Sequence, residues 1–234
     1  MNVDISLDPQ HPYDNITKAC QVAESLGISG LWSPENAHDG FLPLVVAATN
    51  TSRLELGTRV AIAFARSPMN MAYIAWDIQK ISNGRFILGL GSQVKGHIRR
   101  RFDMPWDAPA PRMKEYIQAL RAIWECWQSR ERLDFNGRFY KFNLMPIPYT
   151  PEPIEHPHIP IYISVFNRYM SRVAGEVCDG VHLHPLHTLR YLRDVVVPEI
   201  ENGARRAGRS IDDVTLSLSL ILAIGKNNAE IESA

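Results

Sequence analysis

The sequence predicts an α/β fold built around a parallel sheet, and three observations support this. Short apolar segments typical of strands alternate with segments in which apolar residues recur at helical spacing. Residues 86–90 are almost entirely apolar, as expected of a strand buried on both faces. This strand then opens onto Ser92, Gln93 and a basic run ending at Arg101, and ligands bind at such carboxyl ends in α/β folds. The alternation fits a doubly wound sheet or a closed barrel.

The first half of the chain contains four predicted strands. Residues 3–7 form the first strand, and the helix that follows, residues 16–26, ends at Gly27, a residue type that is common just past a helix end. Pro68 begins a second clear helix, which stops at Asn83-Gly84. The other predicted elements are strands at residues 30–33, 54–64 and 86–90 and a helix at residues 41–48.

An insertion, at about residues 130–160, interrupts the alternation after the helix that begins at Pro111. Residues 134–142 predict a hairpin, because Asn136-Gly137 suits the two positive φ angles of a type I′ turn. Residues 146–160 hold six of the sixteen prolines and predict an extended loop. We expect this insertion to shape the substrate pocket. Beyond it, strands are predicted at residues 161–165, 181–183 and 214–224, and helices at residues 170–177 and 189–207, the latter punctuated by Pro198.

Length, composition and charge limit the class of protein that this sequence can encode. The 234 residues, of which 45% are hydrophobic, predict a single domain over residues 1–234. Lys plus Arg and Asp plus Glu both number 25, so no net charge draws the chain to nucleic acid or to an anionic membrane. The three cysteines are far apart and favour neither a disulfide framework nor a metal site, which fits a reducing cytoplasm. No apolar run reaches the ~18 residues of a membrane span, and the first ten residues lack a signal-peptide pattern.

Gly89-Leu90-Gly91 offers only an incomplete dinucleotide-binding GxGxxG motif. The third glycine would fall at position 94, which is Val94. The motif does not open the first strand and helix of the chain, and no helix is expected promptly after it. The doubly wound, dinucleotide-binding interpretation is therefore the weaker one.

Residues 83–92, closely preceded by Arg66-Ser67-Pro68, resemble the fourth-strand signature of the luciferase-like monooxygenase superfamily. Other segments fall at the places expected for that family: Trp32 with Glu35, His38 and Asp39; Leu56-Gly57-Thr58; and Ala174-Gly175 followed by Cys178-Asp179-Gly180-Val181. The resemblance covers essentially the whole chain. It implies a (β/α)8 barrel, with a flavin-like ring over the carboxyl ends of the strands and hydride transfer at the ring's C5.

Two details resemble the branch of the family that uses the deazaflavin coenzyme F420 in place of FMN. They are the loop Gly91-Ser92-Gln93-Val94-Lys95 with His97, and the ending His182-Leu183-His184-Pro185. The polyglutamyl tail of F420 is acidic, so this interpretation expects a basic rim. The residues available for it are Lys95, Arg99, Arg100, Arg101 and Arg168.

The resemblance also implies where the cofactor binds. A non-prolyl cis peptide is expected at the end of the third strand, at Arg59-Val60 or the next bond, where it supports one face of the ring. The phosphate is expected at backbone N–H groups where a helix begins after the fifth strand. The implied cofactor-binding residues are Asp39, Arg59, Val60, Ser92, Val94, His97, Val165, Phe166, Asn167, Arg168 and His184. Relatives often have Gly-Gly or Gly-Pro where this chain has Phe166-Asn167.

The acid-base residues are predicted from the end of the second strand. Many relatives carry an acidic residue followed by His there, but in this chain Glu35 is followed by Asn36. We therefore expect His38 to be the proton donor and Glu35 to be an orienting carboxylate. The alternative is that His38-Asp39 is a helix-capping loop.

His182 and His184 lie on one face of the sixth strand and could point into the barrel mouth. They lack a third and a fourth ligand at a suitable spacing, so we expect no metal site.

The prediction is an F420-dependent oxidoreductase that transfers a hydride between the deazaflavin C5 and a small organic substrate, and we expect a homodimer. An FMN-dependent luciferase-like monooxygenase is the alternative. Two other classes stay open: a flavin-binding protein without catalysis, and a barrel hydrolase or lyase without a redox cofactor. The last class needs a dense carboxylate or metal cluster at the strand ends, and we find only Glu35 and Asp39.

Seven strands are predicted, whereas a (β/α)8 barrel has eight. Residue 228 onward has the pattern of a helix start, and family members usually continue past this point. We therefore expect a C-terminally truncated barrel whose first and seventh strands have unpaired edges.

Overall fold

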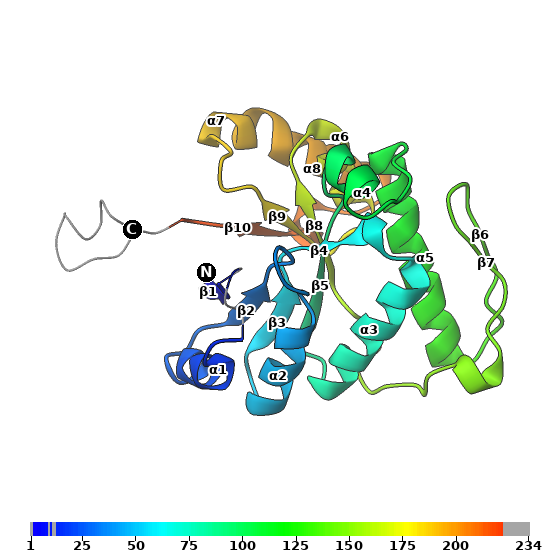
Figure 1. The fold of residues 1–234 in the computed structure, drawn as a ribbon. Coiled ribbons are helices and arrows are strands. Elements are labelled where there is room, and N and C mark those ends of the chain that lie inside the picture. Colours follow the sequence, from blue (N-terminus) through cyan, green and yellow to red (C-terminus); the bar gives the residue numbers. More distant parts are fainter. Residues whose placement is uncertain (1, 9, 11–12, 222–234) are drawn as a thin grey trace.

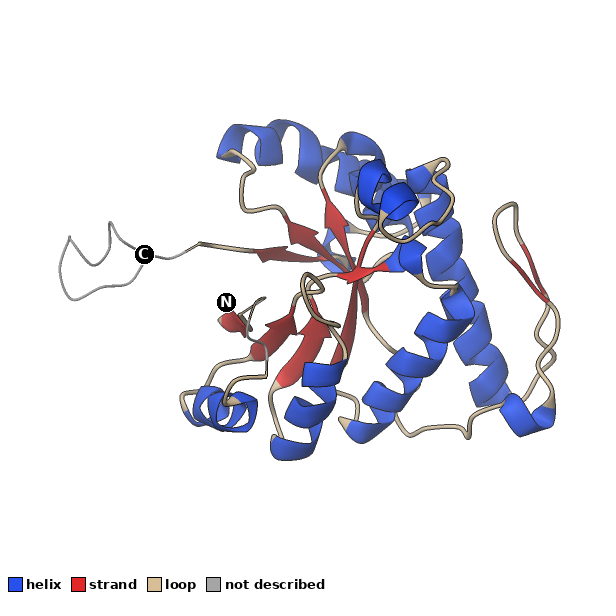
Figure 2. Cartoon of the chain, viewed as in Figure 1, coloured by secondary structure: helices blue, strands red, loops and turns tan. Residues whose placement is uncertain are grey.

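A computed structural model describes residues 2–8, 10 and 13–221 as one curled parallel sheet with helices packed outside it (Figures 1 and 2). The strands lie in the order β1 (Asp4–Ser6), β2 (Gly30–Ser33), β3 (Glu55–Thr58), β5 (Phe86–Gly91), β8 (Ile161–Val165), β9 (Gly180–Leu183) and β10 (Thr215–Leu218). The short β4 (Ala61–Ile62) pairs with β5. Because the order never reverses, the sheet is of the barrel kind and not doubly wound.

The predicted architecture of seven strands in chain order is confirmed. Within the described residues, β1 pairs only with β2 and β10 only with β9. The last residues of the predicted seventh strand, 222–224, and the predicted helix start at residue 228 lie outside the described residues.

Six helices cover the outer face of the sheet. They are α1 (Ile16–Ser25), α2 (Leu42–Asn50), α3 (Pro68–Ile81), α5 (Pro109–Ser129), α6 (Arg168–Val177) and α8 (Val197–Arg206). Every residue of β5 is buried, which confirms the central strand predicted from its apolar run. Helices α6 and α8 pack so closely that a Cβ at Gly203 would come within 2.0 Å of the Arg172 carbonyl oxygen. Glycine at position 203 therefore permits this contact. In the described part of the chain, no helix combines the length and apolar character needed to cross a membrane.

One helix was missed. Residues after β5 were predicted to form a loop, yet α4 (Lys95–Arg100) begins four residues beyond Gly91. Gln93 adopts a positive φ of 58°, which turns the chain, and the fully buried Ile98 anchors the new helix against the core. This anchor depends on tertiary packing that the local pattern does not reveal.

The helix predicted at residues 189–207 is confirmed as one run with a change of geometry inside it. It consists of α7 (Leu189–Tyr191), a π-helical turn (Leu192–Val196) and α8. Pro198 lies in the first turn of α8, where its missing N–H is tolerated because the preceding turn is widened.

The hairpin prediction is confirmed, but its turn type is wrong. Strands β6 (Phe135–Asn136) and β7 (Lys141–Phe142) are antiparallel, and neither Asn136 nor Gly137 has a positive φ. Instead, the Glu115 carboxylate accepts hydrogen bonds from the backbone N–H groups of residues 138–140 at 2.9, 2.6 and 2.7 Å. A side chain distant in sequence therefore sets the turn.

The proline-rich segment is extended, as predicted, apart from a short 3-10 turn (Ile147–Tyr149). Side chains of α3 and α5 fix its backbone: Trp76 donates to the Glu152 carbonyl at 3.1 Å, and Gln128 accepts from the Ile154 N–H at 3.1 Å. The hairpin lies outside α5, on the right in Figure 1. None of the insertion's residues lines the cavity described next, and its part in shaping a substrate pocket stays a prediction.

Candidate functional site

A cavity of about 470 Å³ opens at the carboxyl ends of the strands. The loops after β2, β3, β5, β8 and β9 supply its walls. The predicted site residues that line it are Glu35, Arg59, Val60, Ser92, Val94, Phe166 and His184, and they are joined by Pro34, Asn36, Ile62, Gly91, Gln93 and Ser164. The other predicted residues lie elsewhere.

The chain between β3 and β4 forms one wall. The predicted cis peptide is confirmed between Arg59 and Val60. Below it, the Thr58 hydroxyl donates to the Gly89 carbonyl at 2.7 Å and accepts from the Gly89 N–H at 3.0 Å, which ties β3 to β5. The Arg59 side chain turns toward the barrel interior, where it reaches Ser217 Oγ at 3.3 Å.

Glu35 is held firmly in the wall. Its side chain is only 8% exposed, and its carboxylate accepts from the Ile62 N–H at 2.8 Å and from Arg66 Nη1 at 2.8 Å. Arg66 also pairs with Asp39 at 3.0 Å and lies over the Phe41 ring. We assigned no role to Arg66 from the sequence, although its place in the Arg66-Ser67-Pro68 signature was a usable signal.

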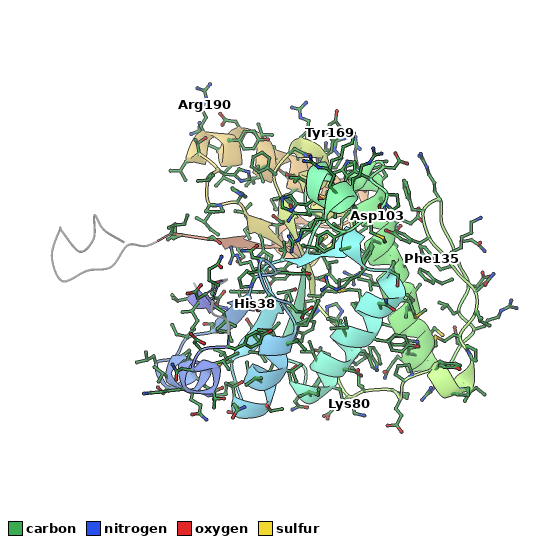
Figure 3. The ribbon with its side chains drawn as sticks, in the orientation of Figure 1. His38, Lys80, Asp103, Phe135, Tyr169 and Arg190 are labelled. Atoms are coloured by element: carbon green, nitrogen blue, oxygen red, sulfur yellow. The ribbon has the colours of Figure 1, made fainter. Side chains whose placement is uncertain are left out.

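Asp39 and His38 do not line the cavity. The Asp39 carboxylate accepts from the backbone N–H groups of Phe41 and Leu42 at 2.8 and 3.2 Å, so the helix-capping interpretation holds for Asp39. His38 is exposed, and its Nε2 lies 3.1 Å from the Gln10 carbonyl oxygen. Figure 3 shows His38 beside the first strands, far from Tyr169 on α6. Its role as proton donor stays a prediction.

The loop after β5 forms the mouth. The Ser92 hydroxyl donates to the Gln93 carbonyl at 3.1 Å, and Val94 projects outward, 58% exposed. His97 lies on α4, exposed and outside the cavity wall. Arg101 joins α4 to the opposite wall by donating to the Asn36 carbonyl at 3.0 Å. The basic residues of α4 thus lie beside the cavity mouth.

The backbone N–H groups at the start of α6, where the phosphate is expected, already have a hydrogen-bond partner within the protein. The Asn167 side chain accepts from the N–H groups of Tyr169 and Met170 at 3.0 and 3.1 Å. Val165 is fully buried behind the wall, and Arg168 lies 3.8 Å from the Glu199 carboxylate. A phosphate bound here would have to displace the Asn167 cap.

The two histidines of β9 face different surroundings. His182 is buried, edge-on to Trp32 at 4.8 Å, and neither ring nitrogen has a hydrogen-bond partner within the described residues. Burial and the nearby positive charge of Arg59 lower the pKa of His182 to about 3. His184 lines the main cavity and packs edge-on to Phe166 at 5.3 Å. Both histidines also line a smaller cavity of about 240 Å³ behind Val60.

A metal centre finds no support in the part of the chain that the structure covers. Over residues 2–8, 10 and 13–221, no group of three or more His, Cys, Asp or Glu side chains could hold a metal ion.

The chain is similar in sequence and in fold to known proteins. A family model described as luciferase-like monooxygenase matches residues 2–234. An uncharacterized protein of Mycobacterium tuberculosis is 44% identical over 98% of this chain and 68% of its own length. The 5,10-methylenetetrahydromethanopterin reductase of Methanolobus tindarius is 29% identical over the whole chain and 69% of the reductase. The structure of the coenzyme F420-dependent tetrahydromethanopterin reductase from Methanopyrus kandleri superposes with a TM-score of 0.77 at 23% identity, over 98% of this chain and 69% of that one.

Proposed function

The chain belongs to the luciferase-like monooxygenase family and is an oxidoreductase, and we propose that its cofactor is coenzyme F420 and its substrate a small organic molecule. The similarity to the reductase of Methanolobus tindarius and to the coenzyme F420-dependent reductase of Methanopyrus kandleri supports this proposal. The structural observation that carries it is the basic helix α4 beside the cavity mouth, with Lys95, Arg99 and Arg100 exposed. An acidic cofactor tail matches this surface, whereas FMN, which ends at its phosphate, makes no use of it.

The cavity itself suits a flat, mainly apolar ring. Its volume of about 470 Å³ falls within the range typical of small-molecule sites. Val60 and Ile62 offer apolar contacts, and the Ser92 hydroxyl in the wall would be available for a hydrogen bond to the polar edge of a ring. Glu35 faces Arg66, so its charge is compensated inside the protein and does not oppose an acidic ligand.

When bound, F420 would supply a hydride donor or acceptor at C5. The residues of this chain would provide its surroundings. Val60 would support the ring, Ser92 would orient its polar edge, and α4 would attract the tail. Asn167 and Arg168 would meet the phosphate after the Asn167 amide has left the α6 N–H groups that it now caps. Ile62 and Arg66 keep Glu35 in place throughout.

The charges of α4 provide a direct test. Replacing Lys95, Arg99 and Arg100 together with Gln should weaken F420 binding by roughly tenfold, because each exposed charge contributes only a fraction of a kcal/mol. FMN binding should change much less. The matched control replaces Arg190, Arg193 and Arg205, three exposed cations on the helical run after β9. Equal losses of F420 affinity in both triple variants would contradict the proposed tail site.

A further inference from the structure

Two exposed apolar side chains lie at the cavity mouth. Phe166 is 62% exposed and Val94 is 58% exposed, although both line the cavity. They come from the loops after β5 and β8, which are neighbouring strands in the sheet. Large exposed apolar side chains at the rim of a concave site are typical of a surface that receives an apolar ligand.

Phe166 belongs to a continuous group of four rings that we call the ring shelf. Its members are Phe166, His184, His187 and Tyr191. Phe166 lies 5.3 Å from His184 and 5.4 Å from His187 between ring centroids, and His187 lies 5.3 Å from Tyr191. The Tyr191 hydroxyl donates to the Phe166 carbonyl at 3.3 Å, and the Leu186 N–H donates to His184 Nδ1 at 3.2 Å. These contacts fix the shelf before any ligand arrives.

The shelf presents aromatic surface and little charge. Burial and the neighbouring His184 lower the pKa of His187, which favours the neutral ring. Neither His187 ring nitrogen makes a hydrogen bond to a described residue. Three cations on this side are paired with carboxylates: Arg168 lies 3.8 Å from Glu199, and Arg190 and Arg193 lie 3.5 and 2.8 Å from Asp194. Aromatic rings arranged in this way bind flat apolar groups by edge and face contacts.

Cations lie on both sides of the cavity mouth, but those beside the shelf are paired with carboxylates. The exposed cations of α4 lie on the β5 side, and the shelf lies on the side of β8 and β9. An acidic cofactor tail and a charged substrate would compete for the α4 side, whereas an uncharged aromatic molecule fits the shelf without losing hydration of a charge.

We propose that the ring shelf is the substrate subsite and that the substrate is a small, uncharged molecule with a flat apolar or aromatic ring. This inference rests on the proposed function and adds the substrate class to it. It assigns Phe166 and His184, which the family resemblance gave to the cofactor, to the substrate instead. The contacts that form the shelf are all made between residues within 166–191.

The neutral fluorescent probe N-phenyl-1-naphthylamine tests the shelf in protein loaded with F420. Phe166→Ser should weaken probe binding by roughly tenfold, and Phe166→Leu should weaken it less, because it retains apolar contact. Phe166 is exposed, so both variants should fold. The control is Tyr149→Ser, since Tyr149 is a similarly exposed aromatic residue, 67%, on the proline-rich segment away from the cavity. Equal effects of Phe166→Ser and Tyr149→Ser, or no effect of either, would overturn the proposal.

Competition identifies the charge of the ligand. Benzyl alcohol should displace the probe at lower concentration than benzoate, and the reverse order would refute an uncharged substrate. The titrations are repeated without cofactor, because the shelf is formed by protein residues alone. Failure of F420 to bind would count against the proposed function, whereas probe binding that ignores Phe166 would count against the shelf.

Discussion

At the scale of single residues, Arg66 has the clearest structural role near the cavity. Its guanidinium joins two carboxylates, those of Glu35 and Asp39, at 2.8 and 3.0 Å. Glu35 is nearly inaccessible to water, so it depends on Arg66 and the Ile62 N–H for compensation. Through these two ion pairs, Arg66 links the wall of the cavity to the start of α2.

Arg66→Met should lower the free energy of unfolding by about 2–3 kcal/mol, because it leaves a buried carboxylate without its cation. Arg168→Met is the control, since Arg168 is mostly exposed and only loosely paired; it should cost less than about 0.5 kcal/mol. Urea unfolding measures both. A loss as small as that of the control would show that Glu35 does not need Arg66.

His182 should make stability depend on pH. Its pKa is lowered to about 3 in the folded protein, against about 6.5 in the unfolded chain. Between these values the unfolded state binds the extra proton, so stability falls as the pH drops below about 6.5, by up to about 1.4 kcal/mol per pH unit, and is constant above it with respect to this group.

His182→Gln should flatten the dependence attributable to this residue, whereas a change at the exposed His97 should leave it intact. Unfolding curves of wild type and both variants between pH 4 and 8 provide the comparison. Identical slopes for wild type and His182→Gln would mean that the ring takes up its proton in the folded state as readily as in the unfolded chain.

At the scale of elements, the hairpin shows a turn imposed from outside. Three consecutive backbone N–H groups donate to the Glu115 carboxylate on α5. Asn136-Gly137 alone favours a two-residue turn. The carboxylate wins because it satisfies three donors at once, whereas a type I′ turn closes a single backbone pair.

Glu115→Ala should therefore speed amide hydrogen exchange at residues 138–140 and cost about 1–2 kcal/mol of stability. Glu125→Ala, at an exposed position of the same helix, is the matched control. Unchanged protection of the hairpin amides in Glu115→Ala would show that the local turn sequence suffices.

The other elements show where sequence reasoning succeeds and where it ends. Apolar runs predicted the buried strands β2, β5, β8 and β9, because the two faces of a buried strand exclude polar residues. The pattern missed α4, because a single anchor, Ile98, holds that helix. It also missed the Asn167 cap, which occupies N–H groups that the family resemblance reserved for phosphate. Local periodicity records burial, whereas caps and anchors depend on which distant groups come together.

At the scale of the whole molecule, the sheet is curled but β1 and β10 each have one strand neighbour among the described residues. The central strands β5 and β8 are paired on both sides. Amide exchange in β1 and β10 should therefore be faster than in β5 and β8. Equal, slow exchange in all four strands of the monomer would show that the two outer strands have further partners.

Some features of the site could also be predicted from the sequence, whereas others depend on how the chain folds. The resemblance placed the cis peptide correctly, and seven of the thirteen predicted site residues line the cavity, because these positions follow the order of the strands. It gave no indication that His38 would face Gln10 outside the cavity, or that His182 would be buried against Trp32. Those outcomes depend on side-chain packing between loops.

Equilibrium binding of the two candidate cofactors distinguishes F420 from FMN. Titrations of the wild-type chain with F420 and with FMN, followed by quenching of its five tryptophans, compare the two ligands under one set of conditions. Trp32, whose ring lies beneath the guanidinium of the cavity residue Arg59, should respond to either ligand. F420 should bind more tightly than FMN, and added salt should weaken its binding because α4 attracts its acidic tail. Tight binding of FMN with no binding of F420 would contradict the proposed cofactor.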